Sequence, residues 1–210
     1  MKIRYLKPYA AGLVLFLTMV LAVAGCTPLN THPVDKHHYD LLPDPHPSLD
    51  RHLNTGAPLV VRAFGIAPVF GSHAFVYRIS RDRYTADYYN EFIRYPSKLI
   101  TDKFTSRLYA TPLFSPVQAS RQTGTRYRLS GKITELYGDY RVREHPKAVM
   151  SVRLVLEKRT NRHFDVIQSR TYDAAVDMPA MTQEDLVSGW NTGLEDIITR
   201  FTDDVARMAK

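Results

Sequence analysis

The sequence predicts an α+β fold, a mainly antiparallel sheet with two helices packed on one face. Three runs between residues 127 and 172 alternate apolar and polar side chains with a period of two, as strands do. One segment before these runs and one after them repeat apolar residues at helical spacing. From residue 59 to residue 210 the composition is that of one domain of about 150 residues, a normal size for a single core.

Two strands are predicted at the start of this domain. Leu59–Pro68 is an apolar run that ends at a proline, and Ala74–Ile79 alternates Phe75, Tyr77 and Ile79 on one face. The stretch that follows is rich in aromatic side chains set among charges: Tyr84, Tyr88, Tyr89, Phe92 and Tyr95.

The first helix is predicted to begin at Pro96, since proline is favoured in the first turn of a helix. Ile100, Phe104 and Leu108 then recur every four residues, which gives the segment an apolar face. The Thr-Pro pair at residues 111 and 112 is expected to end it.

A three-stranded antiparallel meander is predicted next, because the connections between its strands are short. Its strands are Tyr127–Thr134, Ala148–Glu157 and Phe164–Tyr172, with a turn at Thr160–Asn161 between the last two. Gly138 is expected to bend the first strand.

The clearest helix closes the chain. Thr182 with Asp185 three residues later forms a capping-box pattern at its start. Its apolar stripe is predicted to pack on the sheet rather than to bind a partner, and consists of Leu186, Trp190, Leu194, Ile197, Phe201 and Val205.

The N-terminus has the pattern of an export signal. Lys2, Arg4 and Lys7 precede the apolar run Ala10–Ala24, which is too short to cross the ~30 Å hydrocarbon core of a membrane as a helix. The run ends in Val-Ala-Gly-Cys, which resembles the lipobox of bacterial lipoproteins. Residues 1–25 are therefore predicted to be a cleaved signal peptide, and Cys26 to carry a diacylglycerol and an N-acyl chain.

Cysteine and charge agree with this interpretation. Cys26 is the only cysteine, so no internal disulfide can form. Without the signal, Lys plus Arg falls from 28 to 25 against 21 Asp plus Glu, a net charge of about +4 that gives little support to a nucleic-acid partner. Thr27 is not the aspartate that retains enterobacterial lipoproteins in the inner membrane, so the periplasmic face of the outer membrane is predicted.

Residues 26–58 are predicted to be a lipid-anchored tether rich in Pro and His, with a reach of about 30 Å. Five of the eight histidines fall there, namely His32, His37, His38, His46 and His52. Their spacing matches no metal-ligand motif, and we predict neither a metal site nor another cofactor.

No enzyme is predicted. The sequence lacks the Gly-x-Ser-x-Gly elbow of hydrolases and the glycine-rich phosphate-binding loops. Adjacent carboxylates such as Glu184–Asp185 lie on a helix, where neighbours do not share a face, and are expected to be solubilising charge.

Four segments together resemble the ABC-type transport auxiliary lipoprotein family. They are Val61–Pro68 (VRAFGIAP), Phe75–Arg78 (FVYR), Tyr88–Phe92 (YYNEF) with Pro96, and Leu129–Tyr140 (LSGKITELYGDY). The resemblance extends over most of the mature chain. It also implies a first strand at Tyr39–Pro43, which would shorten the tether at its far end.

The resemblance implies a non-catalytic accessory of an intermembrane phospholipid transport system. Its expected partners are an MCE-domain protein with an ABC permease and ATPase. We predict docking by residues of the aromatic and basic stretch, since Tyr and Arg are favoured at interfaces: Tyr77, Arg78, Tyr88, Tyr89 and Phe92. The same aromatics could instead fill the core beneath a hairpin.

Two other functions remain open. An outer-membrane assembly or envelope-scaffold lipoprotein would co-purify with envelope components and have no lipid-transport phenotype. A lipid-anchored periplasmic hydrolase would turn over ester or glycan substrates. A homo-oligomer is also open, because edge strands and exposed aromatics can pair copies of a chain.

Overall fold

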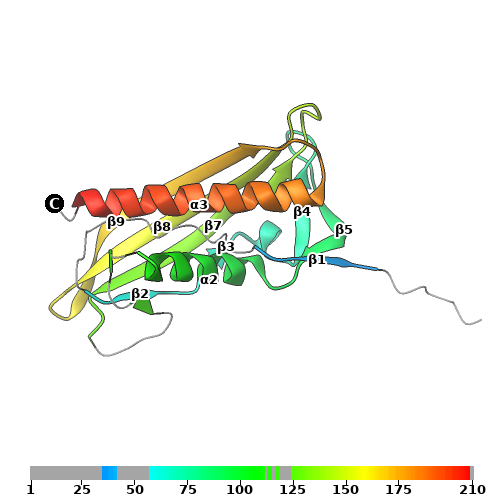
Figure 1. The fold of residues 1–210 in the computed structure, drawn as a ribbon. Coiled ribbons are helices and arrows are strands. Elements are labelled where there is room, and N and C mark those ends of the chain that lie inside the picture. Colours follow the sequence, from blue (N-terminus) through cyan, green and yellow to red (C-terminus); the bar gives the residue numbers. More distant parts are fainter. Residues whose placement is uncertain (1–34, 42–56, 112, 115–116, 119–123, 209–210) are drawn as a thin grey trace, which may run out of the picture. The chain divides into compact units, whose positions relative to one another are not determined.

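A computed structural model describes residues 35–41, 57–111, 113–114, 117–118 and 124–208. They belong to one compact unit that begins at Asp35 and contains a mixed sheet and two α-helices (Figure 1). The predicted α+β class is confirmed. Among the described residues, no helix combines the length and the apolar character needed to span a membrane.

The predicted meander forms the largest part of the sheet. Strands β7 (Tyr127–Asp139), β8 (Lys147–Thr160) and β9 (His163–Asp177) pair antiparallel in sequence order, and each runs beyond the predicted limits. Asn161 turns β8 into β9 with a φ of 55°, a left-handed conformation that Asn tolerates better than most residues. All the predicted inward residues of β8 are buried: Ala148, Met150, Val152, Leu154 and Leu156.

The sheet is only partly antiparallel, because short strands add to it in parallel. β4 (Ala74–Arg78) pairs antiparallel with β5 (Tyr84–Phe92) and parallel with β7 through Tyr77 and Arg78. β1 (His37–Tyr39) adds to β5, and β6 (Val117–Gln118) adds to β2, both in parallel. The sequence did not predict these short pairings, which depend on contacts far apart in the chain.

The single strand predicted over Leu59–Pro68 is two strands, β2 (Leu59–Val61) and β3 (Gly65–Ile66), both parallel to β7. Between them Phe64 is buried, and its backbone N–H donates to Thr101 Oγ1 at 3.0 Å instead of to a strand. A Cβ on Gly131 of β7 would lie 2.6 Å from the Phe64 ring, so glycine leaves the space that this ring fills.

A bend in β7 was predicted at Gly138, but the strand is irregular at another position. The register with β8 shifts between Ile133 and Glu135. At Gly138 the strand continues, and the rings of Tyr77 and Tyr140 stack with centroids 4.9 Å apart, each about 3.1 Å from where a Cβ would lie. Gly138 therefore makes room for two aromatic rings.

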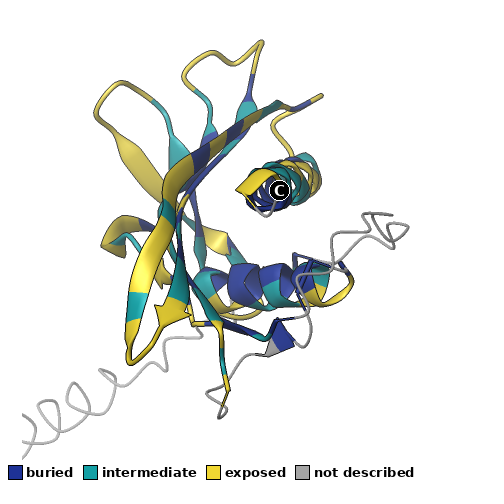
Figure 2. Cartoon of the chain, turned by 90° about the vertical axis from the view of Figure 1, so that its left-hand side faces the viewer, coloured by how far each residue is buried: buried dark blue, intermediate teal, exposed yellow. Residues whose placement is uncertain are grey.

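Both helices lie on the same side of the curved sheet, as predicted (Figure 2). They are α2 (Pro96–Tyr109) and α3 (Gln183–Met208), and a 3-10 turn, η1 (Pro68–Phe70), precedes β4. Thr182 accepts a hydrogen bond from the Asp185 N–H at 3.1 Å and donates to its carboxylate, which confirms the predicted cap. The predicted stripe of α3 is buried throughout.

The predicted tether overlaps the domain. β1 lies within it, Leu41 and Ala57 are buried, and the Tyr39 ring packs 5.2 Å from the Phe75 ring. The reason is the edge of β5, which accepts β1 as a further strand. The resemblance placed this first strand at Tyr39–Pro43, close to its observed position. The predicted signal peptide and Cys26 lie outside the described residues.

Candidate interaction surface

The five residues predicted to dock a partner lie in four different environments. Tyr77 is half-buried on the helix side of the sheet, and Arg78 follows it on the opposite side. Tyr88 and Tyr89 are exposed. Phe92 is in the core. These residues were predicted together because they are close in the chain. Side chains alternate between the two faces of a strand, so the residues lie in different places.

Phe92 is not a docking residue. Its exposed fraction is 2%, and its ring lies 4.6 Å from Phe75 and 5.3 Å from Trp190 between ring centroids. Here the alternative prediction, that the aromatics fill the core beneath a hairpin, is correct. Burial of this kind leaves nothing for a partner to contact.

Tyr88 and Tyr89 stand on an irregular segment of β5 that we call the Asp87 bulge, residues 87–90. Ala86 pairs with Val76 and Glu91 with Ala74, so these residues lie opposite Phe75 alone. The Asp87 carboxylate accepts hydrogen bonds from the backbone N–H groups of Tyr89 (2.8 Å) and Asn90 (3.1 Å). This is the Asx-turn pattern, in which a side chain replaces a backbone partner.

Two side chains complete the coordination of Asp87. The Tyr77 hydroxyl donates to Asp87 Oδ2 at 2.6 Å, and the Asn90 amide donates to the same oxygen at 2.8 Å. Burial raises the pKa of the Asp87 carboxyl, but these hydrogen bonds lower it by more, so the pKa lies below its ordinary value. Burial and the bond to Asp87 both raise the pKa of Tyr77. Tyr77 is therefore a support of the bulge rather than a contact surface.

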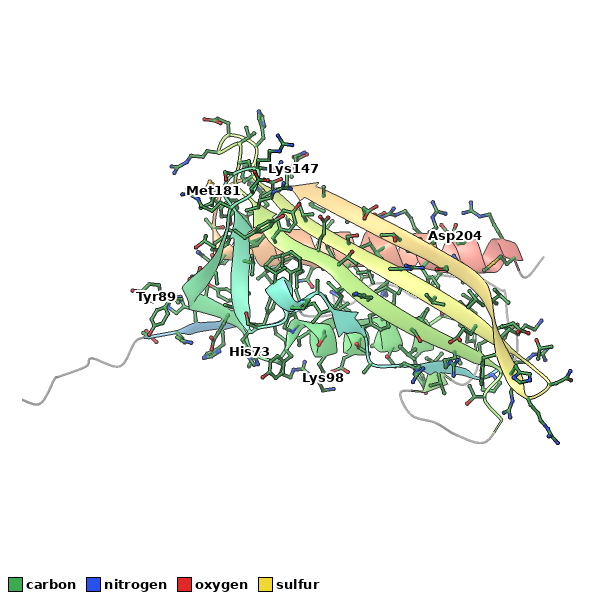
Figure 3. All side chains as sticks on the ribbon, turned by 180° about the vertical axis from the view of Figure 1, so that it is seen from behind. His73, Tyr89, Lys98, Lys147, Met181 and Asp204 are labelled. Atoms are coloured by element: carbon green, nitrogen blue, oxygen red, sulfur yellow. The ribbon has the colours of Figure 1, made fainter. Side chains whose placement is uncertain are left out.

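The bulge exposes two consecutive aromatic rings. Tyr88 is 62% and Tyr89 57% exposed, and their rings meet edge-on with centroids 5.3 Å apart. The Lys36 ammonium lies 5.6 Å from the centre of the Tyr88 ring and pairs with Glu91 at 2.9 Å. In Figure 3, Tyr89 lies at the end of the domain where β1 begins.

Arg78 belongs to a second cluster, on the face of the sheet without helices. Its guanidinium lies 5.5 Å from the ring centre of Tyr84 and 6.0 Å from that of Tyr137, and it donates to the Arg81 carbonyl at 2.7 Å. Phe70 stacks on Tyr137 with centroids 5.9 Å apart. Burial raises the pKa of Tyr137. The predicted docking residue Arg78 therefore lies on the outer face of the sheet, which the helices do not cover.

Beside this cluster lies an open groove of about 760 Å³, at the end of the sheet where β7 turns into β8. Tyr137, Val149 and Ala175 form its apolar floor, and Lys147 and Val142 stand on its rim. Further rim residues are Asp139, Arg141 and His145. Cross-strand pairing of Tyr137 with Val149 and of Val149 with Ala175 aligns the floor on the outer face. Figure 3 shows Lys147 at this end of the domain.

The charges on the rim are paired. Arg141 holds Asp139 through both carboxylate oxygens, at 2.6 and 2.9 Å, and Lys147 pairs with Asp177 at 2.9 Å. The Arg141 hydrogen bonds lower the pKa of Asp139. Val142, by contrast, is 52% exposed between two arginines. An apolar floor with a charged rim is typical of a binding surface.

The described part of the chain contains no group of three or more His, Cys, Asp or Glu side chains placed to hold a metal ion. His37 and His38 are in β1, and His38 lies 3.5 Å from Glu91. The other three histidines of the predicted tether lie outside the described residues.

The fold is shared with solved structures of low sequence identity. Protein XCC0632 from Xanthomonas campestris, assigned to the DUF330 family, superposes with a TM-score of 0.63 at 14% identity, covering 71% of this chain and 83% of that protein. An uncharacterized protein superposes with a TM-score of 0.62 at 14% identity, covering 84% of this chain and 99% of that protein. The hypothetical protein CT253 from Chlamydia trachomatis superposes with a TM-score of 0.54 at 8% identity, covering 72% of this chain and 98% of that protein. At these identities the likeness concerns the fold.

No family model and no curated protein matches the chain. The resemblance to transport auxiliary lipoproteins therefore remains a prediction from the quoted segments, as do the partners it implies.

Sequence reasoning missed Asp87, the residue that shapes the exposed bulge. The sequence does contain a signal for it. Asp87 is followed three residues later by Asn90, and an Asp that accepts the N–H groups two and three residues ahead forms a turn. Reasoning from aromatic content alone passed over it. The groove has no such signal, because its floor comes from three strands.

Proposed function

We propose that this chain is a membrane-anchored periplasmic lipoprotein that acts as a non-catalytic accessory of an ABC/MCE-type intermembrane phospholipid transport system. Cys26 would hold it in the outer membrane, and the folded unit from Asp35 would bind the MCE-domain protein. The sequence supports the anchor, and the quoted segments support the transport system.

The observation that carries the binding role is the groove on the outer face. It combines an apolar floor of Tyr137, Val149 and Ala175 with a rim on which Val142 is exposed. The helices cover the other face of the sheet, so a partner meets this face without displacing the core (Figure 2). The Arg78 guanidinium contacts Tyr137, at 3.5 Å from its hydroxyl and 6.0 Å from its ring centre.

The test is capture of the lipidated protein from crosslinked cells, with the partners identified by mass spectrometry. We expect recovery of an MCE-domain protein with its permease and ATPase. The Val142→Asp variant places a carboxylate on the rim beside Asp139 and should lower that recovery roughly tenfold, which corresponds to about 1.4 kcal/mol. Val166→Asp is the matched control, because Val166 is 58% exposed on β9 and does not line the groove.

The outcomes separate the functions. Equal recovery with both variants contradicts docking at the groove. Recovery of outer-membrane assembly or peptidoglycan-associated proteins without the transport components favours the envelope-scaffold function. Turnover of an ester or glycan panel by the purified protein contradicts a non-catalytic role.

A further inference from the structure

The folded unit begins close to the proposed lipid anchor. From Cys26 to Lys36 the chain has about ten residues, which span at most about 35 Å when fully extended and about 17 Å as a flexible coil. The sequence alone predicted a tether that ended at residue 58. Because β1 is part of the sheet, a lipid on Cys26 would hold the start of the folded unit within this distance of the membrane.

The chain enters the domain beside the exposed tyrosines. β1 runs parallel to β5 with His37 opposite Asn90, so the residues just before His37 lie next to Tyr88 and Tyr89. Lys36 confirms this position through its contacts with the Tyr88 ring and with Glu91. The Asp87 bulge thus lies on the side of the domain at which the chain arrives from Cys26.

Further contacts attach β1 and the residue after it to the rest of the domain. The Ile93 N–H donates to the Tyr39 carbonyl at 2.8 Å, and the Tyr39 hydroxyl donates to Glu184 at 3.2 Å. Arg94 pairs with Asp40 at 3.6 Å. These contacts join β1 to β5 and to the first turn of α3.

The chemistry of this edge suits a lipid headgroup layer. Tyrosine is enriched at membrane interfaces, because its ring is apolar and its hydroxyl remains hydrated. Lys36 adds little net charge here, because it pairs with Glu91, so the two tyrosines carry the proposed contact. Tyr88 and Tyr89 are both more than half exposed, in the bulge where Asp87 accepts the backbone N–H groups of Tyr89 and Asn90.

We infer that the edge formed by Lys36, Tyr88 and Tyr89 rests on the headgroups of the membrane in which Cys26 is anchored. This inference depends on the lipid anchor of the proposed function and assigns these two tyrosines to the lipid surface rather than to the protein partner. It also gives the domain a defined orientation relative to the membrane.

The experiment places a tryptophan at the edge and measures quenching by lipid. Lipidated protein carrying Tyr89→Trp is reconstituted into vesicles of phosphatidylethanolamine and phosphatidylglycerol whose acyl chains are brominated near the glycerol. Tyr109→Trp is the matched control, since Tyr109 is 72% exposed at the far end of α2, about 20 Å along the helix from Pro96. Trp190 is buried and provides the same background in both variants.

We expect the fluorescence added by Tyr89→Trp to be quenched at least about twofold more than that added by Tyr109→Trp. Equal quenching of the two, or none in either, overturns the inference. Thermal melting of each variant checks that it is folded.

Flotation with the vesicles, and its loss in Cys26→Ala, tests the anchor separately. If the unsubstituted protein does not float, the anchor and the proposed function fail together. If it floats without selective quenching at position 89, only the orientation is wrong.

Discussion

Asp87 links the core of the domain to its exposed edge. Its carboxylate accepts four hydrogen bonds, two from backbone N–H groups and two from the side chains of Tyr77 and Asn90. Tyr77 in turn stacks on Tyr140. The orientation of Tyr88 and Tyr89 therefore depends on one half-buried charge, which the aromatic content of the segment did not indicate.

Asp87→Asn should destabilise the domain by about 1–3 kcal/mol, because the introduced amide group faces donors and leaves them without an acceptor. The effect should depend on pH. The folded-state pKa of Asp87 is lowered, so its stabilisation is present above the unfolded pKa of about 3.9 and is lost as the pH falls through the lower folded value. Urea unfolding of both proteins from pH 7 to pH 2 measures this.

Other carboxylates also have lowered pKa values, among them Glu157 and Asp204. Only the difference between the two proteins therefore reports on Asp87. A difference in unfolding free energy that stays constant below pH 4 would contradict the assigned hydrogen bonds.

At the scale of elements, α3 lies unusually close to the sheet at two glycines. A Cβ on Gly189 would lie 2.6 Å from the Cβ of Ala148, and one on Gly193 would lie 3.0 Å from the Cβ of Ala174. Small residues on the helix thus face small residues on β8 and β9. This contact brings Trp190 near enough to donate to the Val149 carbonyl at 3.2 Å.

Gly189→Ala should lower the free energy of unfolding by about 1–3 kcal/mol, because overpacking exceeds the ~1 kcal/mol that alanine adds to helix propensity. The double variant Gly189→Ala with Ala148→Gly moves the methyl group across the interface and should recover part of the loss. Thermal unfolding of the three proteins measures the coupling. A single variant as stable as the unsubstituted protein would mean that α3 shifts without cost.

Periodicity was a sufficient guide to the long elements and to their buried faces. The α3 stripe, the inward face of β8 and the Thr182 cap were all predictable, because each depends on residues a few positions apart. The Leu59–Pro68 run was predicted as one strand, but its division into β2 and β3 and the parallel pairings of β1, β2 and β3 were not, since two or three residues have no measurable period and their partners lie far along the chain. The same limit applies to the outer groove, whose floor combines β7, β8 and β9.

At the scale of the whole molecule, β1 determines where the domain ends and the link to the membrane begins. Leu41 is 4% exposed, and Tyr39 packs on Phe75. The segment from Asp35 to Leu41 is therefore part of the folded unit, although its composition resembles that of a tether.

A chain that begins at Ala57 should be less stable than one that begins at Asp35. Loss of the Leu41 and Tyr39 contacts costs about 4 kcal/mol by buried apolar area, which corresponds to a fall in Tm of roughly 10 °C. A chain that begins at Thr27 serves as the control and should melt together with the Asp35 chain. Identical melting of all three would mean that β1 contributes no stability.

The pairing of β1 with β5 also has a consequence for the order in which the fold is completed. His37 pairs with Asn90, more than fifty residues later, whereas β7 and β8 each pair with the strand that follows them in sequence. A chain that emerges from a ribosome or a translocation channel with its N-terminus first presents β1 long before the strand that receives it. β1 is therefore synthesised before β5 and can join the sheet only after β5 has been synthesised.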